Sequence, residues 1–134
     1  MGVERPRVTT IVIGGMVAVL LFDALGSFAS KLLGFSYVLL TPGSILIYGI
    51  VAALVARRRE WLVGLFAAIL MAFTDVTAGW AVSWLIGPGK PEGGLTTVVV
   101  VGAVMTAVVL GGVAGAIGAW IGVRTMGRSG APAA

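Results

Sequence analysis

The sequence predicts an all-α integral membrane protein with four transmembrane helices, on three observations. Of its 134 residues, 59% are hydrophobic and only 10% are charged. A soluble domain needs about a quarter charged residues to cover its surface, so lipid has to be the main solvent of this chain. The hydrophobic residues gather into four long runs, and most basic residues lie between those runs or near the chain ends.

The four runs define the expected spans. They cover residues 8–33, 38–56, 61–86 and 96–123, which we expect to form one four-helix transmembrane domain over residues 1–126. A span needs roughly 20 apolar residues, so the second run is short and the others are comfortable. None alternates as a lipid-facing strand does, which favours helices. The small and polar residues 127–134 predict a disordered C-terminal tail.

The basic residues predict the orientation. With the N-terminus in the cytoplasm, only Lys31 and Lys90 fall outside. Inside fall Arg5, Arg7, Arg57, Arg58, Arg59, Arg124 and Arg128. Because cytoplasmic loops are rich in Lys and Arg, we expect a multi-pass protein of the inner (cytoplasmic) membrane with both termini cytoplasmic. The first run is too long for a signal peptide, so we expect it to remain as a span.

The composition also excludes several kinds of site. The chain has no cysteine and no histidine, which removes disulfides, thiolate chemistry and imidazole ligands of zinc or haem. No basic stretch alternates with aromatic residues as in single-strand binding, so we expect no nucleic-acid partner. We predict no cofactor, metal ligand or catalytic residue.

Two aspartates lie inside the predicted spans, on segments that resemble each other. Asp23 lies in LLFDALGSFAS (residues 20–30) and Asp75 in MAFTDVTAGWA (residues 71–81). A carboxyl group at bilayer depth costs several kcal/mol unless it is paired, protonated or hydrated. The two aspartates are therefore the candidate functional site.

The same segments predict two tandem two-helix repeats. Five residues after each aspartate stands an aromatic residue, Phe28 or Trp80, and with one insertion the match extends to Gly34 and Gly87. The first and third spans also run in the same direction, as in parallel repeats. Chance similarity between apolar helices is the alternative interpretation.

Helical geometry places both carboxyl groups at one depth, about 21–23 Å from the inner boundary. At 100° per residue, both aspartates share a face with small residues, and bulky ones stand opposite. The Asp23 face carries Gly15, Met16, Val19, Gly26, Ser27, Ser30 and Gly34, and the Asp75 face carries Gly64, Ala68, Met71, Ala78, Gly79, Val82 and Ser83. Opposite stand Leu21, Leu25, Phe28 and Leu32 on the first span, and Phe73, Trp80 and Trp84 on the third.

Two carboxylates at one level repel each other, so a proton, a cation or a hydroxyl partner has to compensate them. No Lys or Arg lies at that depth, and Lys31 is about 12 Å away along the helix axis. Candidate hydroxyl partners are Ser27, Thr74, Thr77 and Tyr48, and we expect Ser27, Ser30 and Ser83 to line an outer path. The alternative is that each aspartate is protonated and bonds across a helix interface, which contributes only about 0.6 kcal/mol.

Two further segments carry structural predictions. At Thr41-Pro42-Gly43-Ser44, either a short helix begins at Pro42 with free N–H groups near the aspartates, or a helix from Tyr37 is kinked there. Tyr37, Trp61 and Trp84 are expected at the membrane interfaces. The glycines Gly111, Gly115, Gly118 and Gly122 predict close packing of the fourth span, within the subunit or between subunits.

The leading functional hypothesis is a small membrane protein that binds or translocates a proton, cation or small cationic solute at Asp23 and Asp75. Four helices enclose little volume, so we expect a homo-oligomer in the lipid bilayer. The second hypothesis is an accessory or structural subunit of a larger membrane complex, with Phe28, Trp80, Trp84 and the glycine-rich span as its partner surface. A membrane enzyme comes third, supported only by the two carboxyl groups.

Overall fold

The computed structural model describes residues 7–90 and 93–128. All regular structure in these two stretches is helical, and four helices are long and apolar enough to cross a membrane. They are Val8–Leu33, Tyr37–Ala56, Trp61–Ile86 and Thr97–Thr125. The predicted class, an all-helical chain with four apolar spans, is confirmed.

The first two spans are joined by a tight turn. Helix α1 (Val8–Leu33) ends at Gly34, whose φ of 71° and bond from its N–H to the Ser30 carbonyl (2.9 Å) make a left-handed cap that glycine adopts without strain. The second span then begins with a 3-10 turn, η1 (Tyr37–Leu40), and continues as α2 (Thr41–Ala56). The second span is therefore helical from Tyr37 onward, and no isolated short helix begins at Pro42.

The third span changes helix type in its middle. It consists of α3 (Trp61–Thr74), a π-helical turn, η2 (Asp75–Gly79), and α4 (Trp80–Ile86). The fourth span lies within a single helix, α5 (Thr97–Arg128). This helix includes the first two residues of the predicted tail, 127 and 128, and the rest of that tail, residues 129–134, lies outside the described residues.

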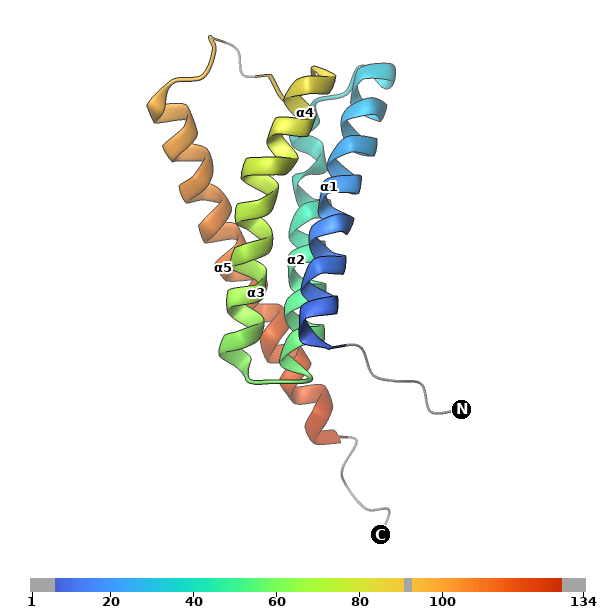
Figure 1. Cartoon of the computed structure of the whole chain (residues 1–134), viewed down its shortest axis with the longest axis vertical. Coiled ribbons are helices and arrows are strands. Elements are labelled where there is room, and N and C mark those ends of the chain that lie inside the picture. The colour runs from blue at the N-terminus through green and yellow to red at the C-terminus, as the bar shows by residue number, and fades with distance from the viewer. Residues whose placement is uncertain (1–6, 91–92, 129–134) are drawn as a thin grey trace.

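The four spans pack unevenly along their length. Helix α5 packs against α2 and α3, whereas α1 packs against α2, η2 and α4. Helix α5 lies close to the others near the end where α1 begins, and it diverges from them toward the opposite end (Figure 1). Its buried positions accordingly start at Gly111, and upstream of them Val98 is 82% exposed.

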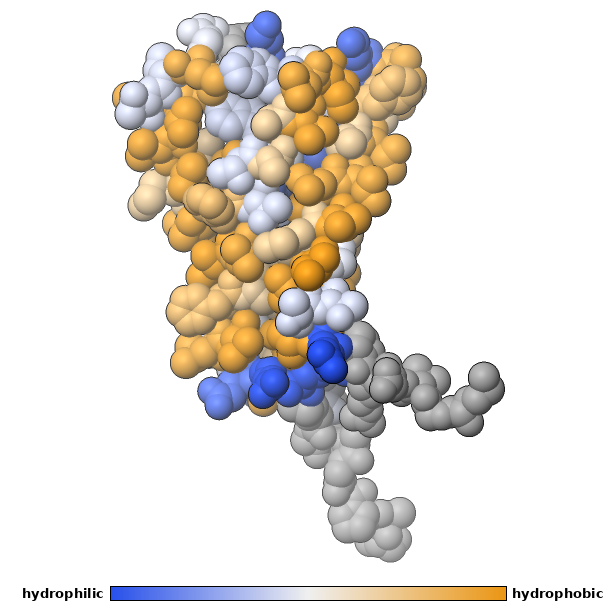
Figure 2. Space-filling view, in the orientation of Figure 1, coloured by the Kyte–Doolittle hydropathy of each residue, from blue (hydrophilic) through white to orange (hydrophobic). Residues whose placement is uncertain are grey.

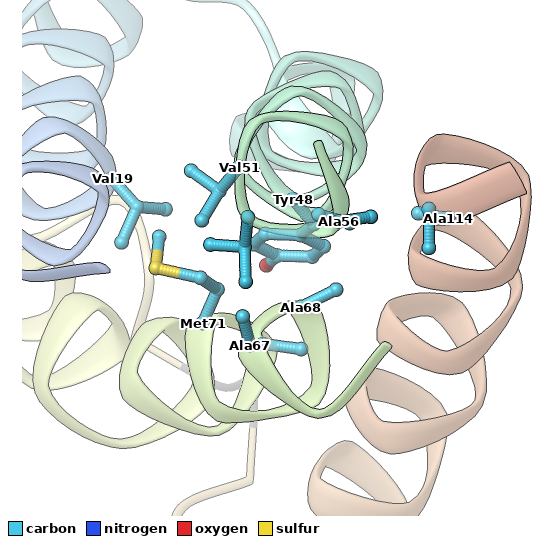
Figure 3. Close-up of a cluster of buried hydrophobic side chains, with 12 residues drawn as sticks. Val19, Tyr48, Val51, Ala56, Ala67, Ala68, Met71 and Ala114 are labelled. Atoms are coloured by element: carbon cyan, nitrogen blue, oxygen red, sulfur yellow. The ribbon is translucent and has the colours of Figure 1, made fainter. Parts of the chain in front are cut away.

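The core is built from small residues and a few larger ones. Val19 of α1, Val51 of α2 and Met71 of α3 meet at its centre, with buried alanines around them (Figure 3). The glycines of α5 allow equally close approach. A Cβ on Gly111 would lie 3.1 Å from the Ala68 carbonyl oxygen of α3, and one on Gly118 would collide with the Gly49 backbone of α2.

The neighbouring glycines repeat this arrangement. A Cβ on Gly115 would lie 2.7 Å from the Ala68 Cβ of α3, and one on Gly122 would collide with the Ala53 backbone of α2. All four predicted packing glycines therefore pack within one chain, and close packing of this kind is typical of membrane helices.

The surface is apolar around the middle of the molecule, with hydrophilic residues at both ends (Figure 2). On α1, Leu21, Leu25 and Leu32 are exposed, on the side opposite Asp23. This distribution is the one that lipid requires, with bulky apolar side chains outside and small or polar ones inside.

Candidate functional site: a buried pair of aspartates

Asp23 faces the inside of the bundle from α1. Its side chain is 1% exposed, and Val19, Ser27 and Ser30 on the same face are also buried. The Tyr37 hydroxyl donates to Asp23 Oδ1 at 3.0 Å. The tight turn at Gly34 brings η1 back against α1, so that the hydroxyl of Tyr37, which the sequence predicts near a membrane interface, also reaches this carboxyl group.

Asp75 occupies the first position of the π-turn. The hydroxyl of Tyr48, one of the predicted partners, donates to Asp75 Oδ2. Tyr48 is buried on α2 and points toward α3 (Figure 3). Each aspartate therefore accepts a hydrogen bond from a tyrosine of the second span.

The two carboxyl groups meet at Gly79. A Cβ on Gly79 would lie 2.8 Å from Asp75 Oδ1 and would collide with Asp23 Oδ2. Only a hydrogen atom fits there, which accounts for a glycine at this position. The two carboxyl groups thus interact directly across the interface between α1 and η2.

The oxygen atom Asp23 Oδ2 is buried and receives no hydrogen bond from any N–H or hydroxyl group of the described residues. Its neighbour is the Asp75 carboxyl, which can form a hydrogen bond with it only if one of the two groups carries a proton. Lys31 does not compensate the pair, because its Nζ donates to the Ile86 carbonyl at 3.0 Å.

Both aspartates line a single cavity of about 250 Å³, which we call the aspartate cavity. Its polar lining comes from the first three spans, and its apolar lining includes one face of α5. No described basic side chain lines it. The polar or aromatic lining residues are Asp23, Asp75, Tyr37, Tyr48, Thr41, Ser44 and Trp80, and the apolar ones are Leu40, Ile45, Val76, Ala103, Ala107 and Leu110.

The other predicted hydroxyl groups lie away from this cavity. Thr74 and Thr77 donate to carbonyl groups of their own helix, those of Leu70 (2.9 Å) and Phe73 (2.6 Å). Such bonds within the helix are the usual way for a threonine to satisfy its hydroxyl in an apolar setting. The prediction that Thr74 and Thr77 bond the carboxyl groups is therefore wrong.

The three serines of the expected outer path are buried and do not line the cavity. Ser30 donates to the Phe35 carbonyl at 2.7 Å, which ties the turn after α1 to the helix. The hydroxyl oxygens of Ser27 and Ser83 have no hydrogen-bond partner among the described residues. These serines belong to α1 and α4, two helices that pack against each other.

Sequence reasoning placed Trp80 on the face opposite Asp75, whereas Trp80 lines the cavity and its indole N–H donates to the Gly89 carbonyl at 2.8 Å. In a regular helix Trp80 would stand about 140° from Asp75. The π-turn contains one extra residue, which reduces that angle to about 40°. For the same reason Ala78, predicted to share the Asp75 face, is exposed. No feature of the sequence signals this turn.

The two carboxyl groups are suitable ligands for a proton or a monovalent cation. The described residues contain no group of three or more acidic, histidine or cysteine side chains that could hold a metal ion. Among the described residues that line the cavity, only the two aspartates are charged, and both tyrosine hydroxyls already donate to them.

The fold and the site together define an all-helical chain with four candidate membrane spans and a buried acidic cavity. Comparisons with protein-family models, with curated proteins and with solved structures give no match. Function is therefore inferred from the residues of this chain.

Proposed function

We propose that this chain binds a proton or a cation between Asp23 and Asp75 and translocates it across the inner membrane. The observation that carries the proposal is the pair of carboxyl groups in direct contact in one cavity, with Asp23 Oδ2 buried and without a donor. Two carboxylates in a medium of low dielectric repel strongly, and no basic side chain among the residues that the structure describes lines the cavity to offset this. A bound proton or cation supplies the missing positive charge.

A structural role explains this arrangement less well. A carboxyl group that only joins two helices contributes about 0.6 kcal/mol on average. Here two of them share a cavity of about 250 Å³, which a purely structural contact does not need. Exchange between a proton and a cation at one site is the simplest use of such a pair.

The proposed orientation has both termini in the cytoplasm. The exposed arginines Arg57, Arg58 and Arg59 follow α2, and Arg124 lies near the end of α5. The loop after α2 and the C-terminal end of α5, which carry these residues, lie at the end of the bundle where α5 packs closely against the other helices (Figure 1). The aspartate cavity then belongs to the outer half of the membrane, where α5 diverges, and a second copy of the chain would add the wall that four helices lack.

The test uses the full chain in proteoliposomes with a pH-sensitive dye inside. Inward gradients of Na⁺, K⁺ and tetramethylammonium are imposed in turn, and proton movement is recorded. Asp23→Asn and Asp75→Asn should each reduce the flux to the level of empty liposomes, because each removes one ionisable group of the pair. Thr77→Val, which alters an exposed hydroxyl bonded to its own helix, is the control and should match the natural chain.

Size-exclusion chromatography in detergent shows whether each variant is folded. Wild-type flux in both folded asparagine variants would overturn the proposal.

A second candidate, a subunit of a larger membrane complex, is favoured by the exposed N-terminal half of α5, where Val98 is 82% and Val101 54% exposed. Co-purification of other chains in mild detergent would support it, and a homo-oligomer that transports alone would contradict it. The predicted partner surface included the glycine-rich fourth span, but Gly115 and Gly118 pack within the chain. Substituting these glycines by leucine would therefore disturb the fold and would not test a partner surface.

A further inference from the structure

We infer that the cation held in the aspartate cavity is an organic ammonium ion with apolar substituents, seated between the two carboxyl groups and the rings of Tyr37, Tyr48 and Trp80. The inference rests on the proposed function, since it names the class of ligand for the same site. It goes beyond that function because the size and lining of the cavity around the carboxyl pair favour an organic cation over an inorganic one.

The first argument is size. The cavity holds about 250 Å³, and a water molecule occupies about 30 Å³ in the liquid, so the space corresponds to roughly eight water molecules. A proton or a bare alkali ion fills a small part of that space. A tetraalkylammonium ion with short chains fills most of it.

The second argument is the state of the polar groups. The Tyr37 and Tyr48 hydroxyls donate to the two aspartates, and the Trp80 indole N–H donates to the Gly89 carbonyl. These donors are engaged, so the three residues offer a ligand their ring surfaces. Aromatic rings attract cations through their quadrupoles, and clusters of such rings recognise quaternary ammonium groups. Asp23 Oδ2, buried and without a donor, adds the negative charge.

The third argument is the remaining wall. Leu40 and Ile45 line the cavity from the second span, and Ala103 and Ala107 line it from α5. The two alanines are half-buried and lie in the part of α5 that diverges from the bundle (Figure 1). An apolar wall suits alkyl groups, whereas a hydrated inorganic ion would lose its water there without replacement.

The experiment measures binding of tetramethylammonium, tetraethylammonium, Na⁺ and K⁺ to the purified full chain in detergent by titration calorimetry. Both organic ions should bind, and an equal concentration of Na⁺ or K⁺ should not displace them. Trp80→Leu should weaken tetramethylammonium binding about tenfold, the loss expected for one desolvated ring. Trp84→Leu is the matched control, because Trp84 is on the same helix, is 38% exposed and does not line the cavity.

A second pair of variants tests the wall. Ala107→Leu adds bulk beside the cavity and should weaken tetraethylammonium binding at least tenfold, whereas Ala81→Leu adds the same bulk at an exposed position of α4 and should leave it unchanged. If Trp80→Leu does not fold, Ala107→Leu carries the test.

The outcomes distinguish a failure of this inference from a failure of the proposed function. Tight Na⁺ or K⁺ binding that depends on Asp23 but not on Trp80 or Ala107 would overturn the inference and leave the proposed function intact. Absence of binding by all four ions, together with wild-type proton flux in both asparagine variants, would remove the proposed function as well.

Discussion

The first and third spans each bring an aspartate to the same point, but they do so with different helices. Helix α1 is a regular α-helix over 26 residues, whereas the third span contains a π-turn from Asp75 to Gly79. The buried Ser30 stands seven residues after Asp23, and the buried Ser83 stands eight residues after Asp75. Seven residues of α-helix complete nearly two turns, but eight overshoot by about 80°.

The π-turn absorbs this difference. Its extra residue restores the phase, so that Ser83 faces inward like Ser30. The comparison also revises the proposed repeat, because Phe28 and Trp80, which were matched by their spacing from the aspartates, are not equivalent. Phe28 is 58% exposed, whereas Trp80 lines the cavity. The two aromatic residues have the same spacing from the aspartates in the sequence, but the helix types of the two spans differ, and so do the positions of the side chains.

The largest difference between the two spans is expected when one residue is deleted from each. Deletion of Ala24 rotates the remainder of α1 by about 100° and turns Ser27 and Ser30 out of the bundle. Deletion of the exposed Thr77 converts the π-turn into a regular turn and leaves the downstream phase unchanged. We expect no monodisperse protein in detergent for the first deletion and a folded chain for the second. Similar yields and thermal midpoints for both would break the comparison.

A smaller effect on stability is expected from a substitution at Gly79, where the two carboxyl groups meet. Gly79→Ala places a methyl group against both carboxyl groups, and overpacking of this kind costs about 1–3 kcal/mol. The thermal midpoint in detergent should fall, and cation binding should weaken. Gly14→Ala in α1 is the control, because a Cβ there meets nothing within 4 Å, and alanine should stabilise the helix slightly. An unchanged midpoint for Gly79→Ala would contradict the close contact of the carboxyl groups.

The smallest effect concerns two serines on the same face of α1. Ser30→Ala loses the hydrogen bond to the Phe35 carbonyl (2.7 Å) and should reduce the free energy of unfolding by about 1 kcal/mol. Ser27→Ala removes a buried hydroxyl without a partner, so it should be neutral or stabilising by up to about 1 kcal/mol. Chemical denaturation in mixed micelles measures both, and a loss for Ser27→Ala as large as that for Ser30→Ala would refute the assignment.

Much of the fold was readable from the sequence because apolar runs end where polar residues, glycine and proline begin. The predicted first and third spans, residues 8–33 and 61–86, coincide with the observed ones, and the second and fourth differ at their ends by at most two residues. The inward face of α1 was also predictable, since a regular helix repeats every 3.6 residues. Asp23, Val19 and Ser27 are buried accordingly.

The site was predicted only in part. Asp23, Asp75 and Tyr48 were identified because ionisable and hydroxyl groups are rare at that depth. The bond from Tyr37 to Asp23 could not be predicted, since it depends on how the turn after Gly34 folds back. Trp80 was placed on the wrong face, since helical periodicity assumes 100° per residue and the π-turn breaks that assumption. The divergence of α5 depends on packing along its whole length, which spacing alone does not report.

The glycines of α5 have a mechanical consequence. Because Gly111, Gly115, Gly118 and Gly122 pack the C-terminal half of this helix closely against α2 and α3, its less tightly packed N-terminal half is held mainly at one end. The stretch from Gly111 back to Thr97 is about 21 Å long, so a rotation of about 10° at Gly111 would displace Thr97 by about 4 Å. A small rotation near these glycines would therefore be amplified along the part of α5 that lines the aspartate cavity.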